Sequence, residues 1–221
     1  YKTEIKGCIL FEQEWCNHSL DDYLKNEENP LTIEQKIDIS KQLVLKMFTY
    51  HEAGYVHRDT TPGNLFIKDV DGKLVLFIGD HGYSAMHTNP DSMKKRSSTI
   101  EGNNGYAYWS PELDYNSVYS NTEIDTQKID AWGVGMSLLE IFNYEDFKSY
   151  DYDRNLILKS DSFSLMLDKI FIKQQNEDIT KRRLEKRWLE KIRFIIEGLL
   201  KQELTERMSI PLSDINCWRY W

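Results

Sequence analysis

The stretch His57-Arg-Asp-Thr-Thr-Pro-Gly-Asn64 decides the fold, because the signature of a tight β-hairpin follows it at once. Two apolar runs, 65–67 and 74–78, flank the dipeptide Asp71-Gly72, which favours a two-residue turn. In an antiparallel hairpin the start of the first strand lies beside the end of the second. We therefore expect the loop that ends at Asn64 to meet the segment that follows residue 78.

Three polar side chains flank this hairpin in the sequence: Asp59 and Asn64 precede it, and Asp80 follows it. Transfer of a phosphoryl group from a nucleotide needs a group that orients the attacking hydroxyl and oxygen ligands that hold Mg²⁺ against the phosphates. Asp59 suits the first role, and Asn64 and Asp80 suit the second. The pattern predicts that the three side chains converge on one metal site at the edge of the hairpin.

The same residues resemble the motifs of eukaryotic-type protein kinases. His57-Arg-Asp59 with Asn64 matches their catalytic-loop pattern H-R-D-x-x-x-x-N, and Asp80-His-Gly82 stands where they carry D-F-G. Further landmarks follow in order over nearly the whole chain: Tyr108-Trp-Ser-Pro-Glu112, Asp130-Ala-Trp-Gly-Val-Gly135 and Arg207. The resemblance implies an α+β, mainly α fold: a kinase-like C-terminal lobe, with a short hinge strand and a small β-hairpin that carries the catalytic and metal-binding loops.

ATP and Mg²⁺ are the cofactors that the resemblance implies, and a protein hydroxyl is the implied substrate. Asp59 and Asn64 are then the catalytic residues, and Asn64 and Asp80 are the metal ligands. The histidines of the two motifs, His57 and His81, are expected to pack in the core and not to act as acids or bases.

Residues 12–16 look like the hinge between the two lobes of a kinase. The resemblance implies that backbone groups of this segment bind adenine, with Glu14 and Cys16 as the expected contributors. Phe66, two residues after Asn64, would form the apolar floor beneath the base.

The resemblance also implies structural or regulatory roles for several residues. It implies that Glu112 and Arg207 form a buried ion pair and that Asp130 braces the backbone of the catalytic loop. It also implies that Arg58 pairs with a phosphorylated residue of the activation segment. The candidates, by position and by the charged residues beside them, are Ser97, Ser98 and Thr99.

The expected organisation is a remnant of a small-lobe strand plus the hinge over residues 1–18, then the large lobe over 19–221, with the activation segment at 80–112. Ser19-Leu-Asp-Asp22 and Thr32-Ile-Glu-Gln35 are capping boxes that predict helix starts. Further helices are expected over 129–142, which is apolar on every side, and over 184–199, which is amphipathic with a basic outer face.

Some features depart from the kinase pattern. His81 replaces the usual Phe, Thr61 stands where Ser/Thr kinases carry a lysine, and Gly105 lies near the position of the substrate-loop threonine. Ahead of the hinge, residues 1–11 contain no Gly-rich phosphate loop, strand lysine or partner glutamate. These elements normally cover the nucleotide, so an upstream segment or a second chain is an expected partner.

Composition narrows the classes of function. The net charge of -8 argues against a surface that follows a phosphate backbone, so nucleic acid is not an expected partner. The sequence contains no run of about 18 apolar residues, so no membrane span is predicted. The three cysteines show no metal-ligand spacing. The sequence therefore favours a cytoplasmic protein with reduced thiols.

Three functions remain open on the sequence. The leading interpretation is a Mg-ATP-dependent protein kinase, with Ser/Thr favoured over Tyr. A pseudokinase that serves as a binding or scaffolding module is the first alternative, because a site without its cover is open to water. A small-molecule phosphotransferase of the aminoglycoside or choline kinase type is the second, because Pro62-Gly63-Asn64 and the long hairpin resemble those enzymes.

Overall fold

The computed structural model describes residues 2–5, 8–11, 13–86, 108, 110–111, 125–149, 160–174, 182–201 and 203–210. Its helices are α1 (Leu20–Leu24), α2 (Ile33–Glu52), α3 (Thr126–Ser149), α5 (Ser160–Gln174) and α6 (Arg182–Leu199), with the 3-10 turns η1 (Pro62–Asn64) and η2 (His81–Tyr83). Its strands are β1 (Lys2–Ile5), β2 (Cys8–Phe11), β3 (His18–Ser19), β4 (Tyr55–Val56), β5 (Leu65–Val70), β6 (Lys73–Ile78) and β7 (Ala85–Met86).

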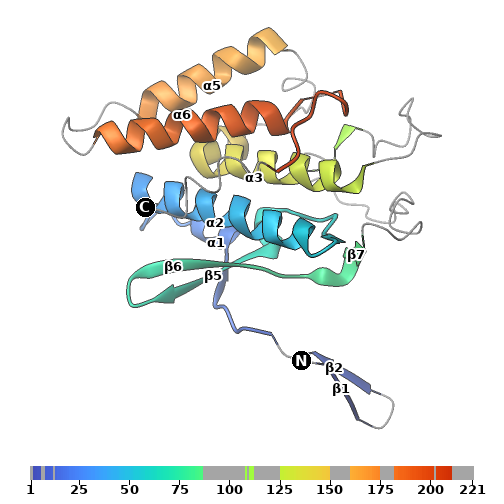
Figure 1. Cartoon of the computed structure of the whole chain (residues 1–221). Coiled ribbons are helices and arrows are strands. Elements are labelled where there is room, and N and C mark those ends of the chain that lie inside the picture. The colour runs from blue at the N-terminus through green and yellow to red at the C-terminus, as the bar shows by residue number, and fades with distance from the viewer. Residues whose placement is uncertain are drawn as a thin grey trace.

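The helices form one body, and the small sheet lies against one side of it (Figure 1). Helix α3 packs against α2, α5 and α6, so it occupies the centre of the body. Its segment from Ile129 to Phe142 is buried residue after residue, as the uniformly apolar sequence predicts. The non-helical backbone of Asn143 then interrupts α3.

Both predicted capping boxes are present. The Ser19 hydroxyl accepts from the N–H of Asp22 at the start of α1, and the Thr32 hydroxyl accepts from the N–H of Gln35 at the start of α2. Helix α2 buries one face against the core and ends before Gly54, whose φ of 82° suits glycine. The start and end of α2 follow the sequence signals.

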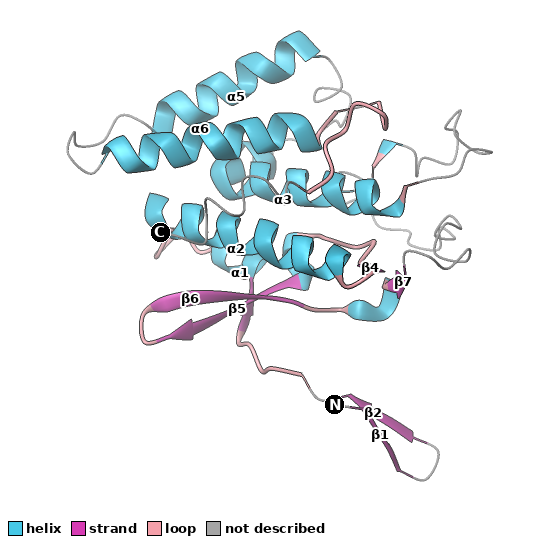
Figure 2. Ribbon diagram, viewed as in Figure 1, coloured by secondary structure: helices cyan, strands magenta, loops and turns pink. Residues whose placement is uncertain are grey.

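The hairpin forms with the predicted turn and joins a third strand. Strands β5 and β6 pair antiparallel from Leu65↔Ile78 to Val70↔Lys73 (Figure 2), and β3 pairs with the other side of β5. Asp71 and Gly72 both have positive φ, 53° and 82°, as a type I′ turn requires. Burial alternates along β5 and β6, so every second side chain of these strands lies in the core beneath α2.

The fold class is confirmed as α+β and mainly α, with elements that the sequence did not reveal. The expected short strand before the hinge is β2, but it pairs with β1, which was not predicted. Strand β7, at the start of the expected activation segment, pairs with β4, and neither strand was predicted. Helix α5 was not predicted either.

Candidate active site

The catalytic-loop candidates lie between β4 and β5, at the end of the hairpin opposite its turn. Asn64 closes the turn η1, and its side-chain Nδ2 donates to the backbone oxygen and to Oδ2 of Asp59, each at 2.9 Å. Asn64 also accepts, through its backbone oxygen, the N–H of Gly79 at 2.9 Å. The amide group of Asn64 thus fixes the Asp59 carboxylate, while its backbone joins the loop to the segment after β6.

Asp80 follows Gly79 directly, so the hairpin brings it to the same edge as Asn64. Its backbone is left-handed, with φ 51° and ψ 67°, and its exposed carboxylate accepts the N–H of Gly82 at 3.3 Å. This bond caps the turn η2. The register therefore places the two predicted metal ligands on adjacent backbone segments.

Asp130, on α3, holds the backbone just before Asp59. Its two carboxylate oxygens accept the N–H groups of His57 at 2.7 Å and Arg58 at 2.6 Å, and His51 Nε2 lies 2.9 Å from the same carboxylate. Arg58 has a positive φ of 68°, which is costly for a residue with a Cβ. The two charge-assisted bonds stabilise this conformation and thereby set the position of Asp59.

Helix α3 also touches the loop after Asp59. A Cβ built on Gly133 would lie 2.9 Å from the backbone oxygen of Thr60, and the Ser137 hydroxyl donates to that oxygen at 3.3 Å. The absence of a side chain at Gly133 therefore permits close contact between helix and loop.

The two motif histidines differ in their surroundings. His57 is fully buried, and its Nε2 lies 2.9 Å from the backbone oxygen of Gly79. His81 is exposed, so the expectation that it packs in the core is wrong; its ring instead stacks on Tyr50, with centroids 5.8 Å apart. Although His81 is exposed, the part of its ring that is buried lowers its pKa, and the neighbouring His57 lowers it further. An imidazole at the surface keeps its polar atoms near water, which explains the difference from a phenylalanine.

The Arg58 side chain contacts the start of the activation segment. Its Nε donates to the backbone oxygen of Tyr83 at 2.6 Å, next to the β4–β7 pairing. The phosphorylation candidates Ser97, Ser98 and Thr99 lie outside the described residues.

The hinge candidates lie along β5. Glu14 forms an ion pair with Lys68, and burial raises the pKa of the half-buried Cys16 thiol, with the Glu14 charge adding to the effect. The ring of Phe66 fills the space that a side chain at Gly79 would need, since a Cβ there would lie 2.4 Å from it. The predicted adenine floor thus lies directly beside the residue that precedes Asp80.

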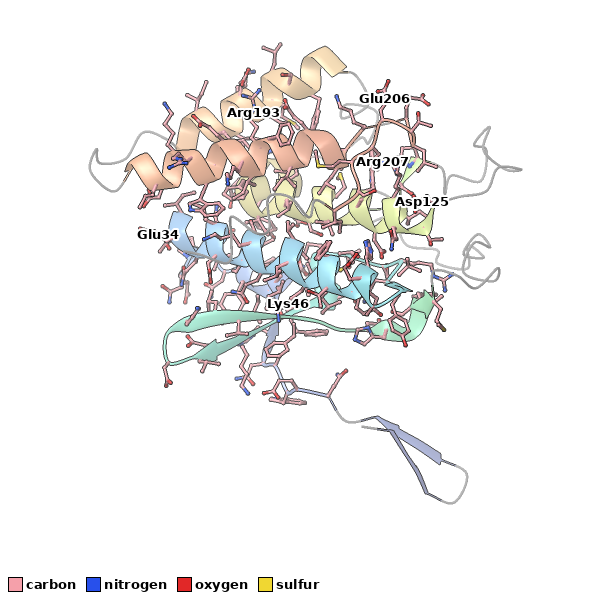
Figure 3. The ribbon with its side chains drawn as sticks, in the orientation of Figure 1. Glu34, Lys46, Asp125, Arg193, Glu206 and Arg207 are labelled. Atoms are coloured by element: carbon pink, nitrogen blue, oxygen red, sulfur yellow. The ribbon has the colours of Figure 1, made fainter. Side chains whose placement is uncertain are left out.

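Arg207 is buried in the loop after α6, next to the first turn of α3 (Figure 3). Its guanidinium donates to the backbone oxygens of Lys201 at 2.9 Å and Lys128 at 3.2 Å, and it lies over the Trp132 ring at 5.0 Å. Its expected partner Glu112 lies outside the described residues.

Sequence reasoning missed the contact between Tyr108 and Glu140. The Tyr108 hydroxyl donates to the carboxylate of Glu140, which is buried on α3. Burial raises the pKa of Glu140 to about 7, against the opposing effect of the Tyr108 hydrogen bond. The one available signal was a second acidic residue, besides Asp130, within an otherwise apolar helix.

The architecture and the loop geometry together define the large lobe of a kinase-like phosphotransferase fold. The family model described as the protein kinase domain matches residues 3–217. This chain therefore belongs to the protein kinase domain family.

Individual relatives match over part of their length. The chain is 27% identical over 146 residues to the interferon-induced, double-stranded RNA-activated protein kinase of Mus musculus, covering 65% of this chain and 25% of the relative. It is 32% identical over 120 residues to a probable cyclin-dependent serine/threonine-protein kinase of Dictyostelium discoideum, covering 54% and 17%. It is 24% identical over 159 residues to the ephrin type-B receptor 3 of Xenopus laevis, covering 72% and 15%.

The matched region spans a quarter or less of the length of these three relatives. None of the helices within the described ranges combines the length and the apolar character that a membrane crossing requires.

Proposed function

We propose that this protein transfers the terminal phosphoryl group of Mg-ATP to a hydroxyl of a protein substrate. The observation that carries this proposal is the hydrogen-bonded pair of Asp59 and Asn64, joined through Gly79 to Asp80. These are the polar groups that phosphoryl transfer by a protein kinase needs at one site.

Asp59 is the residue that orients the substrate hydroxyl and accepts its proton. Its carboxylate is fixed from one side by the Asn64 amide, and its backbone is fixed from the other by the bonds from Asp130 to the residues before it. A group that is already held in place loses little freedom when the substrate binds, which is how positioning contributes to rate.

The donor set fits Mg²⁺ bound to a nucleotide. Both hydrogen bonds of the Asn64 side chain within the described residues use Nδ2, so its Oδ1 accepts none there and is suited to a hard cation. Asn64 and Asp80 would hold the metal, which supplies neutralising charge for the phosphates.

The adenine-binding surface, the cover over the phosphates and the acceptor hydroxyl are also assigned as in a protein kinase. Phe66 offers an apolar surface for adenine, and the backbone of Glu14 and Cys16 is the expected hydrogen-bonding edge. The elements that cover the phosphates belong to a small lobe, supplied by an upstream segment or a second chain. Serine and threonine are the favoured acceptors, in keeping with the relative named as a serine/threonine-protein kinase.

The test compares matched Asp→Asn variants in an assay of phosphate transfer from labelled ATP. Asp59→Asn and Asp80→Asn should each lower transfer to casein by at least about 100-fold, since each removes a group that acts in the transition state. Asp71→Asn is the control, because Asp71 has the same left-handed backbone as Asp80 and lies at the other end of the hairpin. It should retain activity within about twofold.

The same assay separates the other interpretations. Equal transfer by the wild type and both active-site variants would refute the proposal. Transfer to choline or an aminoglycoside but to no protein would favour a small-molecule phosphotransferase. Labelled phosphoserine or phosphothreonine in the product supports the favoured acceptors, whereas phosphotyrosine alone would overturn that preference.

A further inference from the structure

Two lysines from two helices lie against one indole ring, and the charge of a third lysine, on a strand, acts on one of them. Lys41 of α2 places its Nζ 4.0 Å from the centre of the Trp188 ring, and Lys191 of α6 places its Nζ 5.1 Å from the same ring. Lys73, at the start of β6, lies close enough for its charge to act on Lys41. We call Lys41, Lys73 and Lys191 the lysine triad.

The triad is held on rigid elements. The side-chain amide of Gln42 donates to the backbone oxygen of Leu74 at 2.8 Å and accepts the N–H of Leu76 at 2.9 Å, so it ties α2 to β6. Helix α6 packs against α2, and Leu189 and Ile192, on either side of Lys191, are buried. The three cationic groups are therefore brought together by the fold before any ligand arrives, which lowers the entropic cost of binding.

The charges of the triad are poorly neutralised. Within the described part of the chain, no carboxylate lies within ion-pair distance of a triad lysine. Asp38 is the acidic group that acts on Lys41, and its carboxylate already accepts a hydrogen bond from Gln42 at 2.9 Å. Burial is the main cause that lowers the pKa of Lys41; the charge of Asp38 opposes it, and the smaller effects of the Lys191 and Lys73 charges lower the pKa further. Adding an anion would relieve this repulsion.

The triad is separate from the active site. Lys73 opens β6 beside the hairpin turn, whereas Ile78 closes it next to Gly79 and Asp80. The intervening strand is about 17 Å long at the usual rise per residue. A ligand at the triad would therefore leave the site around Asp59 open.

We propose that the lysine triad, two members of which contact Trp188, is a docking surface for an acidic segment of a protein partner. Carboxylate or phosphorylated side chains match its charge, and aliphatic stems of such a segment can pack on the indole. A short peptide suits a compact cluster of three charges. A nucleic acid does not, because its continuous phosphate backbone would also meet the rest of a chain whose net charge is -8.

The proposal is tested by fluorescence anisotropy of a fluorescein-labelled hexaglutamate peptide with the purified protein, a measurement that needs no catalysis. Replacing all three triad lysines by Gln should weaken binding about tenfold or more. The control replaces Lys169, Lys186 and Lys201 by Gln, since these exposed lysines remove the same charge elsewhere on the surface. It should weaken binding by about twofold or less at physiological salt.

A second variant distinguishes a loss of the binding site from a loss of folding. Lys41→Arg keeps both the charge and the contact with the ring, so it should bind within about twofold of the wild type. Equal weakening by the two triple variants, no binding to the wild type at millimolar peptide, or tighter binding of a single-stranded oligonucleotide of equal charge would each overturn the proposal. Because the readout is binding, a failed docking experiment says nothing against phosphate transfer, and the reverse also holds.

Discussion

Two acidic side chains, Asp130 and Glu140, are buried on α3, and they differ in the number of hydrogen bonds and the charges around them. Asp130 receives two backbone N–H groups and faces His51, so its charge is well compensated. Glu140 receives the hydroxyl of Tyr108, with Lys25 as the cation acting on it and Asp21 as an opposing negative charge. Burial without a close cation favours the protonated carboxyl. Asp130 therefore braces the catalytic loop, whereas Glu140 changes charge near neutral pH.

Replacing Glu140 by Gln should therefore change how stability depends on pH. The pKa of Glu140 is raised from 4.5 to about 7 in the folded protein, so the folded state holds a proton that the unfolded state loses first. Its contribution to stability is full below about pH 4.5 and is lost as the pH rises through 7, by on the order of 3 kcal/mol. Glu140→Gln keeps an acceptor for Tyr108 and removes this loss.

The measurement is the free energy of unfolding in urea, taken for both proteins at pH values from about 5 to 8. The stability of Glu140→Gln relative to the wild type should increase from pH 5 to about 7 and level off above it, because only the wild type has to ionise the buried carboxyl. Other titrating groups affect both proteins alike and cancel in the difference. Two curves that stay parallel would show that Glu140 is not a buried titrating group.

At the scale of single residues, the sequence predicted what local spacing encodes. Asn64 follows Asp59 closely enough that one short loop brings them into contact, and the hairpin register places Gly79, the residue before Asp80, against the backbone of Asn64. The Tyr108–Glu140 contact joins residues 32 positions apart and has no spacing signal. The exposure of His81 was also missed, because the motif position indicates where the backbone runs but not how a polar ring is solvated.

At the scale of elements, the contact between α3 and the catalytic loop depends on one missing side chain. Gly133 allows the helix to approach the backbone oxygen of Thr60, and the buried Ser137 hydroxyl donates to that oxygen one turn later. A backbone oxygen cannot rotate away as a flexible side chain can. Any Cβ at this position must move either the helix or the loop that carries Asp59.

Gly133→Ala should consequently lower both stability and activity. We expect a loss of about 1–3 kcal/mol in the free energy of unfolding and a drop in transfer rate of about tenfold or more, because displacing the loop misplaces Asp59. Gly198→Ala is the matched helix control: its Cβ would press mainly on the terminal methyl of Met208, which can move. If both variants unfold at the same urea concentration and transfer phosphate at the same rate, the close contact has no special role.

Elements were predictable where their signals are long or strong. The capping boxes, the apolar run of α3 and the Asp-Gly turn each involve several residues that agree, and all three appear in the structure. Strands β3, β4 and β7 have two residues each, which is too short for any hydrophobic period. They form because neighbouring segments provide an edge, and that information is tertiary.

At the scale of the whole molecule, the two ends of the β5–β6 hairpin belong to different candidate sites. The end at Asn64 and Gly79 contributes backbone and side chains to the candidate active site, while the turn end at Lys73 contributes to the lysine triad. Helix α2 runs alongside both and is tied to β6 by Gln42. This link fixes the distance between the candidate active site and the lysine triad.

Binding of nucleotide to the whole protein should appear as thermal stabilisation that depends on magnesium. A ligand present at about 100 times its dissociation constant adds about 2.7 kcal/mol to the free energy of unfolding, which for a chain of this size raises Tm by about 5–10 °C. The wild type should show this shift with Mg-ATP, and ATP with EDTA should produce a much smaller one. Asp80→Asn should lose the magnesium-dependent part, whereas Asp71→Asn should keep it.

The pattern of shifts distinguishes a catalytic protein from a scaffold with the same fold. A magnesium-dependent shift that disappears in Asp80→Asn means that the carboxylate acts through the metal, since the hairpin and Phe66 are unchanged. A shift that is equal with EDTA and in Asp80→Asn means that adenine binds without a functional metal site. No shift at millimolar Mg-ATP, even with a small lobe supplied, would leave the hydrogen-bonded pair of Asp59 and Asn64 as a structural feature of a binding module.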